Sequence, residues 1–242
     1  VYAGSGSIRL DAGSGNMTPG YLQAGSGAAL DSGGSLTIAR AIGGDVGSLT
    51  LTADGNLTIN APIAHVGNGL TAHAGGDLSI NRQLDGIGGF LGLSAGNNVY
   101  VNADVASANA PLSVNAGGTL VQAANGVDAY GAPMTRQLRS GGAPLSVRVG
   151  DDLNLGSLVT SGSLSVVSTG GDININVPIY ETTGYTSLWA AGDILVNQVV
   201  ANATTGADLL MQAGGDIAVN AKIGPWDRSD ATYPVVNRDA LP

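Results

Sequence analysis

One short pattern recurs along the chain at a nearly constant interval, and it constrains the fold more than any other feature. Its form is Ala-Gly-x-(Asp/Asn)-aliphatic-x-aliphatic-Asn, with copies or close variants at residues 53–60, 74–81, 95–102, 169–176, 190–197 and 213–220. The first aliphatic position falls at Leu36, Leu57, Leu78, Val99, Leu120, Leu153, Ile173, Ile194 and Ile217. The successive steps are 21, 21, 21, 21, 33, 20, 21 and 23 residues. Such a period is typical of a solenoid, in which each repeat forms one turn.

Apolar and polar residues alternate within each repeat, as half-buried strands require. Leu49 and Leu51 precede a Gly-rich turn, Leu57 and Ile59 follow it, and Ile63 lies beyond Asn60. Each repeat therefore holds about three short strands, and no segment shows sustained helical periodicity. One repeat cannot bury its own apolar face, but stacked turns can. The predicted fold is all-β: a single-stranded parallel β-helix with rungs of about 21 residues, each rising ~4.8 Å.

The composition suits a thin aliphatic core and excludes several classes of protein. Aromatic residues make up 4% and charged residues 11%, whereas Gly accounts for 39 of 242 residues. Gly has no three-residue period, which excludes collagen, and 43% hydrophobic content argues against disorder. The net charge of −9 disfavours nucleic acid and anionic lipid as partners. The absence of Cys excludes disulfides and thiolate chemistry.

The sequence also informs the expected boundaries. The chain has no run of 18 apolar residues, so no membrane-spanning helix is predicted. Without an initiator Met or a signal-peptide pattern at Val1, we expect a processed product or a piece of a longer chain. We expect a β-helix of about ten rungs over residues 1–223, with an extra-rung loop near 124–143, and a non-repeat tail, cap or linker over 224–242. The loop holds Tyr130, Met134, Arg136 and Arg139, so it is net basic and the best place to look for a ligand or partner contact.

Two polar columns follow from the repeat. Stacked amides along the rod are predicted for Asn60, Asn81, Asn102, Asn176, Asn197 and Asn220. Carboxylates of Asp77, Asp152, Asp172, Asp193 and Asp216 share another column with Asn56 and Asn98. Closely spaced carboxylates can hydrolyse glycosides, but here the residue type repeats with the coil instead of converging in one cleft. We interpret the second column as a turn feature, with cation binding and catalysis as alternatives.

Other motifs have ordinary explanations. Residues 92–96 match Gly-x-Ser-x-Gly, but that motif needs a strand, a strained elbow and a helix, and Ser94 is predicted to be an outward strand residue. His65 and His73 are the only histidines, and His73 should share a solvated outward column with Thr52, Ser94 and Trp189. Triplets for N-glycosylation begin at Asn16, Asn56 and Asn202, in a chain rich in Asn and Thr. We assign no catalytic, cofactor-binding or metal-ligating residue.

The repeat also resembles a known family. The segments at 53–60, 74–81 and 213–220 are similar to the rungs of filamentous-haemagglutinin-like exoproteins, large bacterial adhesins of the two-partner secretion pathway. The resemblance covers roughly residues 30–223 and implies a right-handed β-helix, export through an outer-membrane transporter partner, and a role in adhesion, biofilm or contact-dependent interaction. The Asn-Pro-Asn-Gly type motif of the family's secretion domain is missing, so the chain resembles an internal shaft segment.

These observations predict an extracellular or cell-surface structural and adhesive shaft, not an enzyme and without a cofactor. Its partners would be the transporter during export, then a host-cell, glycan or neighbouring-cell surface, or another copy joined end to end. One alternative is a self-assembling extracellular fibre or sheath subunit, which filaments of the purified protein would favour. Another is a polysaccharide-active β-helix enzyme, which glycan turnover abolished by Asp193→Asn would support.

Overall fold

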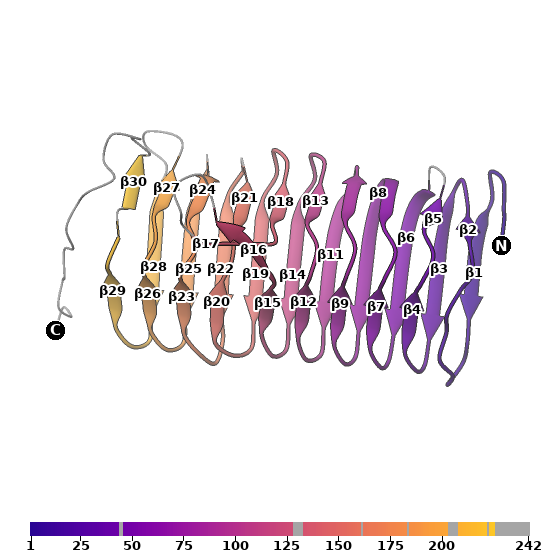
Figure 1. The fold of residues 1–242 in the computed structure, drawn as a ribbon, viewed down its shortest axis with the longest axis horizontal. Helices are drawn as coiled ribbons and strands as arrows, with labels where there is room; N and C mark the ends of the chain where they lie inside the picture. The colour runs from indigo at the N-terminus through magenta and orange to yellow at the C-terminus, as the bar shows by residue number, and fades with distance from the viewer. Residues whose placement is uncertain are drawn as a thin grey trace.

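The chain folds into an elongated β-solenoid whose turns are stacked side by side along one axis (Figure 1). The computed structural model describes residues 1–43, 46–127, 133–160, 162–182, 184–202, 208–221 and 223–225. Within these ranges every regular element is a strand. The predicted all-β fold, its parallel solenoid architecture and its spacing of about 21 residues are confirmed.

Three parallel sheets run along the rod, and each turn of the chain contributes a strand to each of them. Sheet I follows the Gly-rich turn and contains β4 (Leu36–Ile38), β7 (Leu57–Ile59), β9 (Leu78–Ile80), β12 (Val99–Val101) and β15 (Leu120–Gln122), then β20 (Leu153–Leu155), β23 (Ile173–Ile175), β26 (Ile194–Val196) and β29 (Ile217–Val219). These nine strands mark nine consecutive turns in the described part of the chain, and their hydrogen bonding is divided between β15 and β20 into a five-stranded and a four-stranded part.

Sheets II and III complete each turn. Sheet II contains β2 (Leu22–Gln23), β5 (Ile42–Gly43), β10 (Leu84–Ile87), β13 (Val105–Ser107), β18 (Leu138–Ser140), β21 (Leu158–Thr160), β24 (Ile179–Thr182), β27 (Val200–Asn202) and β30 (Ile223–Pro225). Sheet III contains β1 (Ser7–Asp11), β3 (Gly27–Ser32), β6 (Val46–Ala53), β11 (Phe90–Ala95), β14 (Leu112–Ala116), β19 (Leu145–Val149), β22 (Leu164–Ser168), β25 (Thr186–Ala190) and β28 (Leu209–Ala213). Strand β8 (Ile63–Ala74) belongs to both, because it continues around the corner between them.

The core is a narrow column of aliphatic side chains that point inward from all three sheets. Leu78 lies in register with Leu57 on one side and Val99 on the other, and all three side chains are fully buried. The same stacking of like residues continues through Leu153, Ile173 and Ile194. Burial of one such side chain contributes roughly 1.5–3 kcal/mol, so the repeated burial of several per turn is the main source of stability.

At the corner between sheets III and I, glycine on several turns lets consecutive turns approach each other closely. A Cβ placed on Gly96 would lie 2.1 Å from the carbonyl oxygen of Gly75, and one placed on Gly117 would lie 2.0 Å from that of Gly96. A side chain at either position would push the neighbouring turn away, although Asp54 and Ala191 take the equivalent position on two other turns. The Gly-rich turn of the repeat therefore reflects close backbone packing between turns in addition to the turn within each repeat.

The long step of the repeat is an inserted hairpin. Strand β16 (Ala124–Val127) pairs antiparallel with β17 (Pro133–Thr135), and the chain returns to sheet II at Leu138. Gln122 holds the base of the hairpin, because its Nε2 donates to the carbonyl of Arg136 at 2.7 Å and its Oε1 accepts from the amide of Gly156 at 3.0 Å. Sheet II continues past the hairpin from β13 through β18 to β21, whereas sheet I is divided there, because β15 and β20 do not pair.

Candidate functional site

The Asp/Asn column lies at the corner where sheet III turns into sheet I. In each pair a side-chain oxygen accepts the backbone N–H of the equivalent residue one turn later. The pairs are Asn16–Ser35 (2.7 Å), Ser35–Asn56 (3.2 Å), Asn56–Asp77 (2.9 Å), Asp77–Asn98 (3.0 Å), Asn98–Thr119 (3.0 Å), Asp152–Asp172 (2.9 Å), Asp172–Asp193 (2.7 Å) and Asp193–Asp216 (2.7 Å). In each of these pairs a short side chain supplies an oxygen acceptor, as at a helix N-cap. Thr119 differs, because its hydroxyl donates to the carbonyl of Asp152 at 2.6 Å.

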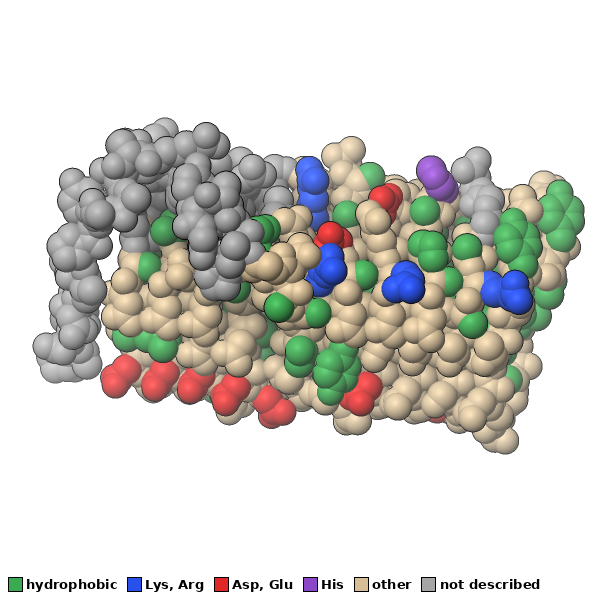
Figure 2. Space-filling view, in the orientation of Figure 1, with side chains coloured by type: hydrophobic (Ala, Val, Ile, Leu, Met, Phe, Trp, Pro, Cys, Tyr) green, Lys and Arg blue, Asp and Glu red, His purple; other side chains and the backbone are tan. Residues whose placement is uncertain are grey.

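The C-terminal half of this column is wholly acidic. Asp152, Asp172, Asp193 and Asp216 follow one another on consecutive turns, next to Asp151. Figure 2 shows the resulting line of carboxylates along the edge of the rod. At the spacing of turns, like charges in water repel by about 1 kcal/mol per pair. Each N–H donated to a carboxylate offsets part of this repulsion, since hydrogen bonds to charged groups are stronger than neutral ones.

The acidic column provides carboxylates in a row and not around a common point. The part of the chain that the structure describes contains no group of three or more His, Asp or Glu side chains arranged to hold a metal ion. One oxygen of Asp152, Asp172 and Asp193 is engaged by the amide of the next turn. These contacts support the interpretation of the column as a turn feature.

The predicted Asn column forms two hydrogen-bonded ladders. Asn81 donates from Nδ2 to Oδ1 of Asn60 at 2.8 Å, and Asn102 donates to Asn81 at 2.7 Å. Asn197 likewise donates to Asn176 at 2.8 Å, and Asn220 to Asn197 at 2.9 Å. Ala123 and Gly156 take the same position in the two turns between the ladders, beside the inserted hairpin. The prediction of axial amide bonding is confirmed.

The Gly-x-Ser-x-Gly segment forms no nucleophile elbow. Ser94 points outward from β11, in register with His73 of β8, as predicted. The two side chains are joined by a hydrogen bond of 2.9 Å between Nδ1 of His73 and Oγ of Ser94, a contact that the sequence analysis missed. Among the described residues the ring of His73 has no second partner to orient it. His65, the other histidine, is exposed and has a left-handed backbone with φ of 59°.

The structure covers the remaining candidates only in part. Met134, Arg136 and Arg139 are described, whereas Tyr130 of the predicted loop, Lys222 and residues 226–242 of the predicted tail lie outside the described residues. Oδ1 of Asn16 and of Asn56, two of the three triplet asparagines, accepts a backbone N–H in the corner column. Arg136 directly follows the hairpin, whereas Arg139 lies on β18, a strand of sheet II that the predicted loop had included.

Comparison with known proteins gives no relative. No protein-family model matches the chain, no curated protein matches it, and no solved structure matches it. No described segment is a helix of the length and apolarity needed to cross a membrane. The solenoid architecture alone fits several functions, so a functional conclusion depends on how the surfaces of this rod are built.

Proposed function

We propose that the chain is a segment of an extracellular β-helical shaft, a structural and adhesive part of a secreted bacterial protein that performs no catalysis. The observation that carries this proposal is the continuous turn-to-turn pairing of sheets II and III, which makes each turn a spacer of ~4.8 Å. A rod of this kind holds its two ends at a fixed separation.

The polar features of the surface support a structural role. The corner column satisfies backbone amides, and the Asn ladders bond neighbouring turns. Both therefore join one turn to the next along the axis. A shaft needs such axial bonds, since a pulling force acts along the direction in which the turns would separate.

The resemblance of the rungs to filamentous-haemagglutinin-like exoproteins supports the expected location. In the proposed function, the chain leaves the cell through an outer-membrane transporter partner and folds outside. The lack of Cys is compatible with passage through a narrow pore as an unfolded chain. Glycans, host cells or neighbouring cells are the proposed binding partners of the mature surface protein.

The location can be tested on intact cells of the bacterium that makes the protein. Antibodies against residues 1–225 should label intact cells, and added protease should remove the signal. Deletion of the outer-membrane transporter should abolish surface labelling while the protein is still detected after permeabilisation. Labelling that requires permeabilisation in unmodified cells would contradict the proposal.

The non-catalytic role needs a separate test. The purified chain is incubated with a panel of bacterial and host polysaccharides, and released reducing ends are measured. We expect no release, with Asp193→Asn as a matched variant that keeps the corner acceptor. Release by the unmodified chain that Asp193→Asn abolishes would replace the shaft proposal by a polysaccharide-active enzyme.

A further inference from the structure

The outer face of sheet III carries two neighbouring columns that differ in side-chain size. The first, the small column, contains Ala29, Thr50, Thr71, Gly92, Ser113, Ser146, Ser165 and Ser187. The second, the large column, lies two residues further along each strand and contains Asp31, Thr52, His73, Ser94, Asn115, Arg148, Val167 and Trp189. The registers of these strands place the members of each column on consecutive turns.

The difference in size is greatest from β14 to β25. There the small column is serine on every turn, whereas the large column offers Asn115, Arg148, Val167 and Trp189. On β11 the difference in size is reversed. The ring of Phe90 covers Gly92 of the small column, and its Cε1 lies 2.6 Å from the position that a Cβ on Gly92 would take. The large column has only Ser94 on this strand. A raised column thus runs beside a lowered one from β14 to β25. On β28 Leu210 continues the small column and Gln212 the large one, so the difference in size ends there.

The charge of this face sets it apart from the rest of the chain. The protein carries a net charge of −9. The residues of the two columns from β6 to β25 are all described, and none of them is a carboxylate. Arg148 and His73 are the ionisable side chains of the two columns over these turns. Two copies that approach through sheet III therefore meet less like-charge repulsion than through the acidic corner column.

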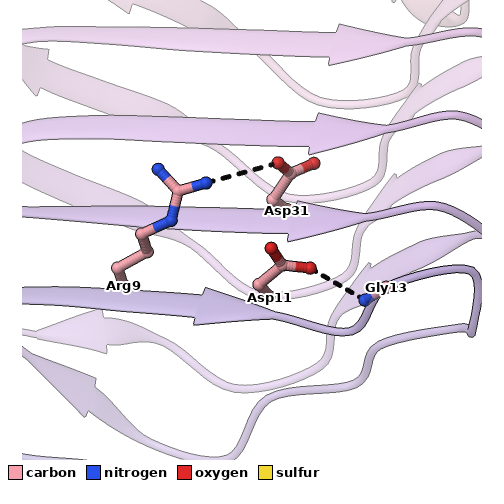
Figure 3. A network of polar contacts seen from close by, with 4 residues as sticks. All are labelled: Arg9, Asp11, Gly13 and Asp31. Carbon is pink, nitrogen blue, oxygen red and sulfur yellow. Dashed lines mark hydrogen bonds and ion pairs between the residues drawn. The ribbon is translucent and has the colours of Figure 1, made fainter.

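Opposite charges stand at the N-terminal end of the same columns. Arg9 continues the small column and Asp11 continues the large one. Figure 3 shows that Arg9 reaches toward Asp31 of the next strand, at 3.9 Å, while Asp11 accepts the amide of Gly13 at 2.8 Å. The Arg9 side chain is 72% exposed, so the intrachain pair leaves most of its guanidinium open to a partner.

We infer that two copies of the chain associate side by side through sheet III, with their rods parallel and related by a two-fold axis that runs along the rod between the two columns. This axis places the large column of each copy over the small column of the other, at the same turn. Trp189 then lies over Ser187 of the second copy, Arg148 over Ser146, and Asp11 over Arg9. A two-fold interface is self-complementary in this way by construction.

The area of the face is compatible with a reversible dimer. Nine strands ~4.8 Å apart and about five residues wide present roughly 700 Å² per copy, close to the ~800 Å² per partner of a standard interface. The contact is mostly polar, with Val167 and Trp189 as apolar side chains toward its C-terminal end. Aromatic residues and Arg are the side chains that contribute most at such interfaces.

The first test is the mass of the purified chain by sedimentation velocity, from about 1 to about 200 μM, the range in which an interface of this size and polarity associates. We expect a concentration-dependent shift from monomer to dimer. Ser146→Trp should weaken association about tenfold or more, since it fills the small column. Ser79→Trp, the same change at an outward position of sheet I, is the control and should leave it unchanged. A chain that stays monomeric throughout, or equal effects of the two variants, would overturn the inference.

Cross-linking tests the register, because the unmodified chain has no Cys. Ser165→Cys lies in the small column and Val167→Cys in the large column of β22. When the two single variants are mixed and oxidised, we expect disulfide dimers containing one of each, at several times the yield of either variant alone. Preferential Ser165→Cys self-coupling would contradict the proposed axis. Circular dichroism of each variant verifies that the solenoid is intact.

Discussion

The Oδ1 atom of Asp172 accepts a hydrogen bond of 2.7 Å from the backbone N–H of Asp193, one turn further along the rod. Asp193 repeats the relationship with Asp216. Sequence alone shows these residues as a column of like charges, which would be unfavourable. The bond explains why the column persists, because each carboxylate supplies the acceptor that the next turn lacks at its corner.

This relationship predicts different effects for two substitutions of Asp172. Asp172→Ala removes the acceptor and should lower the free energy of unfolding by about 1 kcal/mol. Asp172→Asn retains Oδ1, reduces repulsion from neighbouring carboxylates, and should change stability by less than about 0.5 kcal/mol. Asn98, which occupies this position in an earlier turn, shows that an amide fits. Urea denaturation followed by circular dichroism measures both, and equal losses would contradict the capping role.

Close packing of turns predicts that replacement of a corner glycine whose added Cβ meets the preceding turn lowers stability. Gly96→Ala would place a Cβ 2.1 Å from the carbonyl oxygen of Gly75. We expect a loss of about 2 kcal/mol or more, since the backbone of two turns must move apart. Gly20→Ala is the control, because no atom lies within 4 Å of its added Cβ. Thermal unfolding of the two variants should differ clearly, and similar midpoints would argue against the close approach.

In the ladder formed by Asn60, Asn81 and Asn102, replacement of Asn by Asp should have different effects on stability at different positions. Asn81→Asp replaces the donor to Asn60 by an acceptor and should cost about 1 kcal/mol. Asn60→Asp should be tolerated, because Asn60 acts in the ladder only as the acceptor from Asn81. The urea concentrations at which Asn81→Asp and Asn60→Asp are half unfolded, measured at neutral pH, test this prediction. A larger loss for Asn60→Asp than for Asn81→Asp would exclude the assigned direction of the bonds.

Two buried hydroxyl groups predict opposite outcomes. The Thr186 side chain is 2% exposed and its Oγ1 has no hydrogen-bond partner among the described residues, so Thr186→Val should raise stability by about 1 kcal/mol. Ser168 is also buried, but its Oγ donates to the carbonyl of Asp151 at 2.7 Å and accepts from the amide of Gly171 at 3.1 Å. Ser168→Ala should therefore lower stability by about 1–2 kcal/mol. Denaturation midpoints that shift in the same direction would contradict this account.

The stacking of the core could be predicted from the sequence because it depends on spacing alone. Once Leu57, Leu78 and Val99 recur at 21 residues, their common register follows, and the structure confirms it. The axial bonds of the Asn column were predictable for the same reason. A side chain that repeats on every turn must meet its own copy on the next turn.

Features that depend on the path of the backbone could not be predicted. The corner acceptors require knowledge of which amides lack a carbonyl partner, and the sequence shows only that Asp and Asn recur there. Gln122 holds the hairpin by reaching Arg136 and Gly156, which lie 14 and 34 residues away. The contact of His73 with Ser94 depends on side-chain rotamers, which a pattern of residue types does not fix.

The corner hydrogen bonds all point in one direction along the rod: the side chain belongs to the earlier turn and the amide to the later one. A turn that detaches at the C-terminal end leaves behind a side-chain oxygen that water can solvate. Loss of an N-terminal turn instead removes the acceptor of a backbone amide in the turn that remains. The solenoid is thus unequal at its two ends. A chain that folds from its N-terminus finds a side-chain acceptor already placed at most new corners; the exception is the corner of Asp152, where the hydroxyl of Thr119 donates to the carbonyl of Asp152.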